Sequence, residues 1–335
     1  MATEIESLLD YVVNVGGTEL IVTEGAPSAI RLAGKVCNIP DAPAVETGAL
    51  REFLGSVEGD SGSIVGGPWA GVKWRVRYFR AALGNSAVFR PLMAECPNFA
   101  ELGAPQALNN LLGLSSGLVV FAGPACSGKT TSATSYVSAL CESKMLRACF
   151  LNSSDEFPIR AGDSLILANS SGTVPDKMAQ ALRCGCDLFW MGDFEGEDLL
   201  PMLRAAESGA IVICCITAGN SVGAIEALLS GVSLENRALA RTMLAAALKA
   251  VVVQRLLPGA AEGAGAMPAW EILFNTQNVA SFIRNGDHFK LPSVIAASAS
   301  EGMLLMDDCL AELVRGGYVS REEAGKYVSN VARFG

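Results

Sequence analysis

The segment FAGPACSGKT, residues 121–130, constrains the fold of this chain more than any other part of the sequence. A glycine, four further residues and then Gly-Lys-Thr make the spacing of a phosphate-binding loop. The short apolar run GLVVFAG leads into it, and the helix-forming run KTTSATSYVSAL follows it. Strand, loop and helix in this order separate a true phosphate loop from a chance match. The sequence therefore predicts an α/β domain that binds a nucleotide.

Each residue type in this loop suits a bound polyphosphate. Gly123 and Gly128 would let backbone N–H groups turn inward at the positive end of the following helix. Lys129 would reach the β- and γ-phosphate oxygens, and the Thr130 hydroxyl would bind Mg²⁺, so the expected cofactors are ATP and Mg²⁺. The alternative is a glycine turn that happens to contain Lys-Thr. The loop residues predicted to bind nucleotide are Gly123, Cys126, Ser127, Gly128, Lys129, Thr130 and Thr131.

Hydrolysis also needs carboxylates, one at Mg²⁺ and one that orients the attacking water. Asp193 ends the apolar stretch CDLFWMGD, while Asp155 and Glu156 follow the apolar run RACFL. The carboxyl ends of strands line the ligand site in open parallel sheets. We therefore expect Lys129, Asp193 and Glu156 to be catalytic and Asp193 to share Mg²⁺ with Thr130. Either acid could equally be a solvated loop charge.

The chain of 335 residues is long enough for two domains. Residues 1–100 combine an amphipathic start with alternating strand patterns, which predict a small α+β domain. Two of its expected strands, AGVKWRVRYFR and NSAVFRP, meet around Gly84-Asn85. Residues 101–116 are expected to form a linker and lead-in helix. In residues 117–335 strands alternate with helices, which predicts a mostly parallel sheet covered on both faces.

Three later segments have apolar residues at helical spacing: EGEDLLPMLRAAESG, LENRALARTMLAAALKAVVV and MLLMDDCLAELVRGG. A further helix is expected to begin at the capping box formed by Ser320 to Glu323. The only histidine, His288, lies in the polar segment RNGDHFK and is expected at the surface.

Charge, apolar runs and cysteine spacing argue against several classes of protein. A net charge of −9 disfavours a nucleic acid as the main partner. No basic and apolar leader opens the chain, and no apolar run approaches the ~18–20 residues needed to cross a bilayer, so we expect a cytoplasmic protein. The ten cysteines have no regular spacing and are expected to be reduced, packed like small apolar side chains.

From end to end the chain resembles the secretion ATPase superfamily, and within it the PilT-like type IV pilus retraction motors. Matching segments include AVFRP, GLVVFAGPACSGKTTS, ALRCGCDLFWMGD, LRAAESGAIV and AWEILFNTQNVASFIRNG. The resemblance implies a PAS-like N-terminal domain, a RecA-like P-loop motor domain and a hexameric ring with nucleotide at the subunit interfaces. It implies a pilus or secretion platform protein at the inner membrane as partner. It also implies that Arg75 and Arg90 reach toward the phosphates, although both could be exposed strand arginines.

The chain departs from the family pattern in its acidic boxes. After the second motor strand the family has two or three carboxylates, of which Glu156 matches here and Asp155 substitutes in part. The family's Walker B strand ends in Gly-Glu followed by an arginine, whereas this chain has Gly192-Asp193, with Glu195 in place of the arginine. A shorter side chain withdraws the carboxylate by about 1.5 Å, and misplacements of about 1 Å can cost ~100-fold in rate.

Two functional hypotheses remain open. The first is an ATP-binding motor subunit of a type IV pilus or related secretion system, which hydrolyses ATP slowly. The second is a nucleotide-binding structural or regulatory paralogue that assembles with an active ring ATPase. The extent of the resemblance favours the first. The altered acidic boxes favour the second, as do Ala210 and Thr217, which stand where the family has two histidines.

Overall fold

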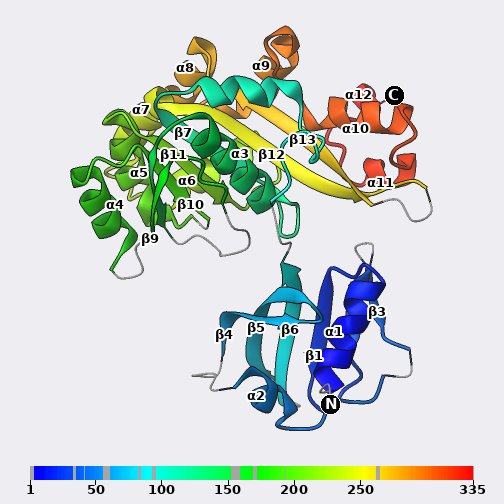
Figure 1. Ribbon diagram of the computed structural model, residues 1–335. Helices are drawn as coiled ribbons and strands as arrows, with labels where there is room; N and C mark the ends of the chain where they lie inside the picture. The colour runs from blue at the N-terminus through cyan, green and yellow to red at the C-terminus, as the bar shows by residue number, and fades with distance from the viewer. Residues whose placement is uncertain are drawn as a thin grey trace. The chain divides into compact units, whose positions relative to one another are not determined.

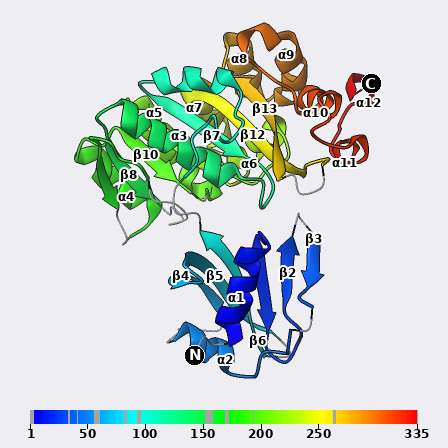
Figure 2. The same ribbon diagram turned by 45° about the vertical axis from the view of Figure 1, so that its right-hand side comes forward.

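The computed structural model divides into two compact units, one that ends at Glu95 and one that begins at Cys96. Figures 1 and 2 show the elements of each unit in two views. Asp155, Glu156 and Asp193 lie outside the described residues, so their predicted roles stay predictions. The structure describes residues 4–32, 35–40, 42–55, 61–81, 84–92, 96–151, 159–168, 172–192, 194–261 and 265–334.

The first unit is a six-stranded sheet with strand order β3-β2-β1-β6-β5-β4, in which every neighbouring pair is antiparallel. The predicted pair of strands that meets at Gly84 is β5 with β6, so the α+β class is confirmed. The elements are α1 (Glu4–Asn14), β1 (Glu19–Thr23), β2 (Ala29–Leu32), β3 (Lys35–Asn38), α2 (Ala49–Leu54), β4 (Ser61–Trp69), β5 (Val72–Ala81) and β6 (Gly84–Leu92).

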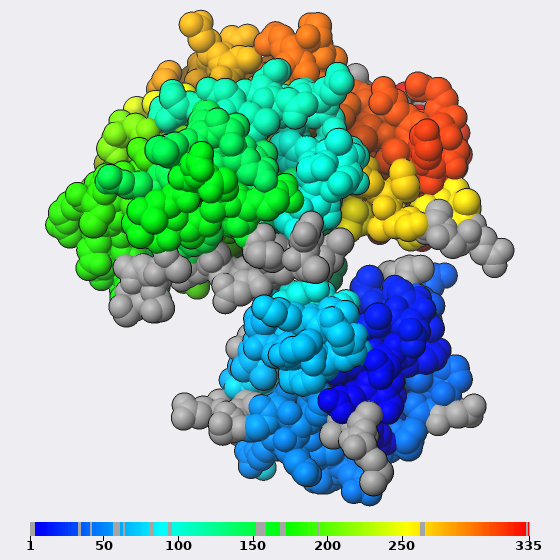
Figure 3. Space-filling model, in the orientation of Figure 1, coloured from blue at the N-terminus to red at the C-terminus, as the bar shows by residue number. Residues whose placement is uncertain are grey.

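Helix α1 covers one face of this sheet. Its apolar residues recur at the 3–4 residue spacing of a helix, and Ile5, Leu9 and Val12 are buried as a result. They share a core cluster with Trp74 and Phe89 from the sheet. The opposite face of α1 remains at the surface, as the dark blue atoms in Figure 3 show.

The second unit contains a seven-stranded sheet with strand order β13-β12-β7-β11-β10-β8-β9. Every neighbouring pair is parallel except β12 with β13, which confirms the predicted mostly parallel sheet. Every residue of β7, β10 and β11 is buried, as expected for strands covered on both faces. The strands are β7 (Gly117–Ala122), β8 (Arg147–Leu151), β9 (Leu165–Ala168), β10 (Leu188–Met191), β11 (Ile211–Ile216), β12 (Leu248–Pro258) and β13 (Ala266–Phe274).

Helices α3 and α5 both pack on β7 and β11, and a C-terminal group of helices follows β13 (Figures 1 and 2). The 3-10 helices are η1 (Gln106–Gly113), η2 (Gly196–Asp198), η3 (His288–Lys290) and η4 (Ala299–Glu301). The α-helices are α3 (Lys129–Ser143), α4 (Val174–Arg183), α5 (Leu199–Glu207), α6 (Ser221–Ser230), α7 (Arg237–Ala247), α8 (Gln277–Asn285), α9 (Leu291–Ala297), α10 (Met306–Arg315), α11 (Arg321–Gly325) and α12 (Val331–Phe334).

One expectation about these elements is wrong, and a second is met only in part. The helical pattern from Leu234 onward ends at Ala247, and the next residues, LKAVVV, form the first half of β12. A short apolar run fits a buried strand as well as a helix, and the β-branched valines favour the strand. His288, which was expected at the surface, is half-buried: its side chain is 13% exposed and its Nε2 atom lies 3.4 Å from Glu226 Oε1 on α6.

The predicted helices over α5 and α10 are confirmed. The capping residue predicted for α11 is confirmed as well, since Ser320 Oγ accepts a hydrogen bond from the Glu323 N–H at 3.2 Å. No helix in the described part of the chain is both long enough and apolar enough to cross a membrane.

Candidate nucleotide-binding site

The loop between β7 and α3 begins at the edge of the sheet where the parallel strands end. Two of its residues have left-handed backbone, Cys126 with φ of 61° and Gly128 with φ of 81°. For a residue other than glycine this conformation costs about 1 kcal/mol or more and is concentrated at functional sites. Gly128 is the N-cap of the 15-residue helix α3 and supplies no side chain to cap its first N–H groups. These donors and the helix dipole favour an anion at this end.

Neither loop glycine could carry a side chain. A methyl group at Gly123 would lie 2.5 Å from the Gln254 carbonyl oxygen and 2.3 Å from Ser127 Oγ. At Gly128 the methyl group would lie 2.9 Å from Gln254 Nε2, and the left-handed backbone disfavours it further. Real Cβ contacts below 3.0 Å essentially never occur. The two glycines are therefore fixed by the close approach of β12 to both ends of the loop.

The polar side chains of the loop are placed for binding an anion. Ser127 is 2% exposed, and its hydroxyl has no hydrogen-bond partner among the described residues. Lys129 Nζ donates to the Pro124 carbonyl at 3.2 Å, so the ammonium group lies over the loop itself. Thr130 and Thr131, in the first turn of α3, are half-buried. A buried hydroxyl without a partner costs about 1–3 kcal/mol, which a bound phosphate oxygen would offset.

A glutamine that the sequence analysis did not single out completes the site. Gln254 lies on β12 and is 2% exposed. Its Oε1 atom accepts a hydrogen bond from Ser132 Oγ, in the first turns of α3, at 2.7 Å. The sequence did contain a signal for it, a single amide residue inside the apolar run VVVQRLL. A polar side chain buried in such a run needs a hydrogen-bond partner, which indicates a specific contact.

These residues fit a nucleotide polyphosphate. The loop combines an uncapped helix N-terminus, left-handed backbone at two positions, an ammonium group and an unpartnered hydroxyl. Thr130 brings a hydroxyl to the same turn, the type of ligand that Mg²⁺ takes beside phosphate oxygens. The arrangement can bind a phosphorylated ligand through backbone donors and one cation.

The ends of β8 and β10 lie at the same edge of the sheet as this loop, with β11 between β7 and β10. β10 pairs with β8 and β11 in parallel, and β11 pairs with β7. Beyond β10, Glu195 forms a capping box with Asp198: its side chain accepts an N–H of η2, and Asp198 Oδ2 accepts the Glu195 N–H at 3.2 Å. Burial raises the pKa of Asp198. The residue that replaces the family's arginine is thus engaged in a local cap.

The positions where the family has histidines differ from each other. Ala210 is 3% exposed, and its carbonyl accepts the Gly117 N–H at 2.9 Å at the start of β7. Thr217 is exposed and directly follows β11. Ala210 therefore packs at the opposite end of β11 from the phosphate loop, whereas Thr217 lies at the loop's end of the sheet.

Arg75 and Arg90 belong to the first unit, where they are direct cross-strand neighbours on β5 and β6. Arg75 is 8% exposed. Arg90 Nε donates to Glu19 Oε1 at 2.7 Å, and Arg31 Nε donates to Glu19 Oε2 at 2.8 Å. Burial alone would raise the pKa of Glu19, but the hydrogen bond from Arg31 and the charges of both arginines hold it below its ordinary value. That the two arginines of β5 and β6 reach phosphates stays a prediction.

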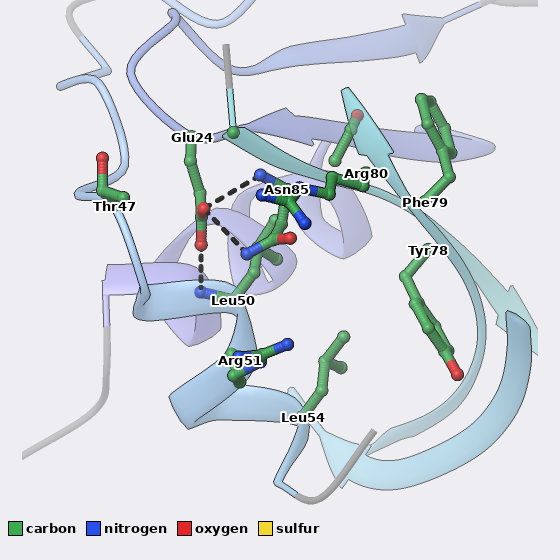
Figure 4. A pocket seen from close by; sticks show the side chains of 11 residues that line it. Glu24, Thr47, Leu50, Arg51, Leu54, Tyr78, Phe79, Arg80 and Asn85 are labelled. Atoms are coloured by element: carbon green, nitrogen blue, oxygen red, sulfur yellow. Dashed lines mark hydrogen bonds between the residues drawn. The ribbon is translucent and has the colours of Figure 1, made fainter. Parts of the chain in front are cut away.

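The first unit also has a cavity of about 270 Å³ between α2 and the β5–β6 hairpin (Figure 4). Glu24 lies in its wall and is fully buried. Its Oε1 accepts the N–H groups of Gly48 and Leu50 at 3.0 and 3.2 Å, and its Oε2 accepts Asn85 N and Nδ2, both at 3.0 Å. Four donors saturate this carboxylate, which therefore serves the fold and has little capacity for a general base.

Known proteins resemble the chain over both units. The type IV pilus retraction ATPase PilT of Pseudomonas aeruginosa is 26% identical over 338 residues, covering 96% of this chain and 97% of that protein. The type IV pilus ATPase PilU of the same organism is 24% identical over 336 residues, covering 96% and 87%. A solved structure of the pilus retraction motor PilT with bound ADP has a TM-score of 0.80 at 22% identity and covers 98% of both chains, so the fold is shared.

The family assignment rests on a longer pattern than any single motif. The model of the type II/IV secretion system protein family matches residues 69–286, which is more than half of the chain and includes the phosphate loop and β12. The chain therefore belongs to the type II/IV secretion system protein family.

Proposed function

We propose that this protein is an ATP-binding motor subunit of a type IV pilus or related secretion system and hydrolyses ATP slowly. The observation that carries the proposal is the loop at residues 123–128, which joins left-handed backbone, an uncapped helix and Lys129 at the end of a buried parallel strand. The similarity to PilT and PilU supports a pilus motor. The ADP in the solved PilT structure supports a nucleotide as ligand.

Each residue then has a defined role. The loop N–H groups and Ser127 bind phosphate oxygens, while Lys129 offsets their charge. Thr130 and Asp193 hold Mg²⁺, which when bound neutralises phosphate charge and fixes the geometry of the phosphate chain. Glu156 orients the attacking water. Positioning and electrostatic stabilisation of this kind supply most of the rate in phosphoryl transfer.

The proposal includes an assembly. The subunits form a homomeric, hexameric ring with the nucleotide at each interface, where Arg75 and Arg90 approach the phosphates. The ring works in the cytoplasm against a pilus or secretion platform protein at the inner membrane. The negative net charge argues against nucleic acid as the object that the ring moves.

A second candidate is a nucleotide-binding structural or regulatory subunit that joins an active ATPase. Glu195 favours this candidate, because it stands where the family has an arginine and supplies no positive charge to the phosphates. Its side chain instead caps η2 together with Asp198. Asp193, whose side chain is shorter than the family's glutamate, also favours this second candidate. Binding would persist in such a protein, since it depends on the loop, Lys129 and Mg²⁺ rather than on the catalytic carboxylates.

Calorimetry with Mg-ADP and Mg-ATP, together with phosphate release by the full chain, tests both candidates. We expect micromolar binding and turnover well below the median enzyme rate of about 10 per second. Lys129→Ala should weaken binding and lower turnover. Turnover that Asp193→Ala eliminates would exclude the regulatory candidate, and binding without any turnover would exclude the motor acting alone. No heat of association with either nucleotide would overturn both.

A further inference from the structure

The middle of β12 holds a buried amide that the sheet does not need. Gln254 follows the buried run Ala250 to Val253, and its backbone pairs with Trp270 of β13 as any residue could. The side chain is nevertheless enclosed, with the whole residue 2% exposed. Burying an amide without full hydrogen bonding costs at least about 1 kcal/mol. An apolar residue would serve the core better, so the contacts of this amide indicate its role.

Gln254 contacts both ends of the phosphate loop, one end through its backbone and the other through its side chain. The backbone carbonyl oxygen of Gln254, which any residue at this position would supply, lies against Gly123, 2.5 Å from where a methyl group would be. The side-chain Nε2 lies against Gly128, 2.9 Å from the equivalent point. One residue of β12 thus touches the first and the last glycine of the loop. The side-chain amide is what a glutamine adds at this position, and it meets the loop at Gly128.

The side-chain amide has a defined orientation. Ser132 Oγ donates to Oε1 at 2.7 Å, so the NH₂ group is turned toward Gly128. Ser132 is itself tied to the loop, because its N–H donates to the Gly128 carbonyl at 3.0 Å. Within the described parts of the chain, the NH₂ group makes no hydrogen bond. The three residues form a closed set of contacts around the start of α3.

We propose that Gln254 is a positioning residue for the phosphate loop, with Ser132 as the residue that orients its amide. The inference rests on the nucleotide binding proposed above and extends it to two residues. By packing its side-chain amide against Gly128 and Ser132, Gln254 holds the end of the loop and the start of α3 in place, so that their backbone N–H groups are positioned before a polyphosphate binds. Such preorganisation raises affinity because less conformational freedom is lost on binding.

The test is a double-mutant cycle on the affinity for Mg-ADP, measured by calorimetry on the full chain. Gln254→Leu keeps the side-chain bulk but removes both polar atoms, and Ser132→Ala removes only the hydroxyl that orients the amide. Ser135→Ala is the matched control, since this serine lies on the same helix, is 1% exposed and has a hydroxyl without a partner in the described residues. Thermal unfolding without nucleotide is measured for every variant.

We expect Gln254→Leu to weaken binding about tenfold and Ser132→Ala somewhat less, with the double variant no weaker than Gln254→Leu alone. Ser135→Ala should bind like the wild type. Unchanged affinity in Gln254→Leu with a lower melting temperature would assign this glutamine to core packing and overturn the inference. Fully additive losses would overturn the role of Ser132.

Three further outcomes keep the inference separate from the proposed function. If Gln254→Leu does not fold, the comparison of Ser132→Ala with Ser135→Ala decides, and equal affinities overturn the inference. If the wild type itself gives no heat with Mg-ADP or Mg-ATP, the proposed function fails and the positioning role fails with it. A wild type that binds, beside variants that bind equally well, contradicts the positioning role alone.

Discussion

In the first unit the buried carboxylates Glu19 and Glu24 accept hydrogen bonds at both oxygens, from arginines in one case and mainly from backbone N–H groups in the other. In the second unit the buried Ser127 hydroxyl of the phosphate loop has no partner in the described chain. The first arrangement stabilises a fold. The second costs free energy unless something else supplies the partner.

The difference separates the roles of these two sets of groups. Groups saturated by the chain's own donors have little capacity left for a ligand, whereas unpartnered groups around an uncapped helix N-terminus are available to one. Variants in the first set should therefore change the free energy of unfolding and leave nucleotide affinity alone. Variants around the loop should change nucleotide affinity and leave the free energy of unfolding nearly unchanged.

Removal of the loop's ammonium group should have the largest effect. We expect Lys129→Ala to reduce turnover by about 100- to 1,000-fold, because it removes the cation that offsets phosphate charge. Stability should hardly change, since the Pro124 carbonyl that Lys129 contacts also accepts the Ser127 N–H at 3.3 Å. Phosphate release and thermal unfolding measure the two effects. Lys290→Ala, at an exposed pair with Asp287, is the control and should keep full activity.

A methyl group at the first loop glycine should have the next largest effect. We expect Gly123→Ala to weaken Mg-ADP binding about 100-fold, because the new Cβ would meet the carbonyl oxygen of Gln254 and force the loop away from β12. Gly113→Ala is the matched control, since nothing lies within 4 Å of its Cβ position. Affinity within threefold of the wild type in Gly123→Ala would contradict the close approach of loop and strand.

The loop and its neighbouring elements could be read from the sequence because their signals are local. Motif spacing, an apolar strand and a following helix all lie within residues 117–143, and the hairpin at Gly84 is equally local. Gln254 could not be found in this way. Its contact with Ser132 spans 122 residues and depends on β12 lying beside β7, which periodicity does not reveal. Periodicity also does not distinguish a short apolar strand from a helix, and for this reason the predicted helix extended beyond Ala247 into β12.

Other features depended on partners far away in sequence or on competing local bonds. His288 is in a polar segment, yet it lies half-buried beside Glu226 of α6. Glu195 was recognised as a departure from the family pattern, but only the geometry shows that it caps η2. Charge and spacing predict which residues are polar, whereas their hydrogen-bond partners decide whether they serve the fold or a ligand.

The saturated carboxylate of the first unit offers the opposite test to the loop variants. We expect Glu24→Gln to lower the free energy of unfolding of this unit by about 2 kcal/mol, because an amide NH₂ would face two N–H donors and leave them unpaired. Hydrogen exchange in β6 and the segment 47–50 should report the loss. Mg-ADP affinity should stay within twofold of the wild type, and a larger change would link this network to the nucleotide site.

The smallest expected effect concerns Glu19 and is distinguished by its pH dependence. Because the fold holds the pKa of Glu19 below its ordinary 4.5, the charged carboxylate stabilises the fold at neutral pH, and this stabilisation is lost as the pH falls through the lowered pKa. Glu19→Gln should therefore cost about 1 kcal/mol at pH 7, since Arg31 and Arg90 are partly exposed and water screens them. The gap between wild type and variant should close below pH 4.5. Urea unfolding at several pH values measures it, and a gap that widens in acid would show that the two arginines do not stabilise the charged form.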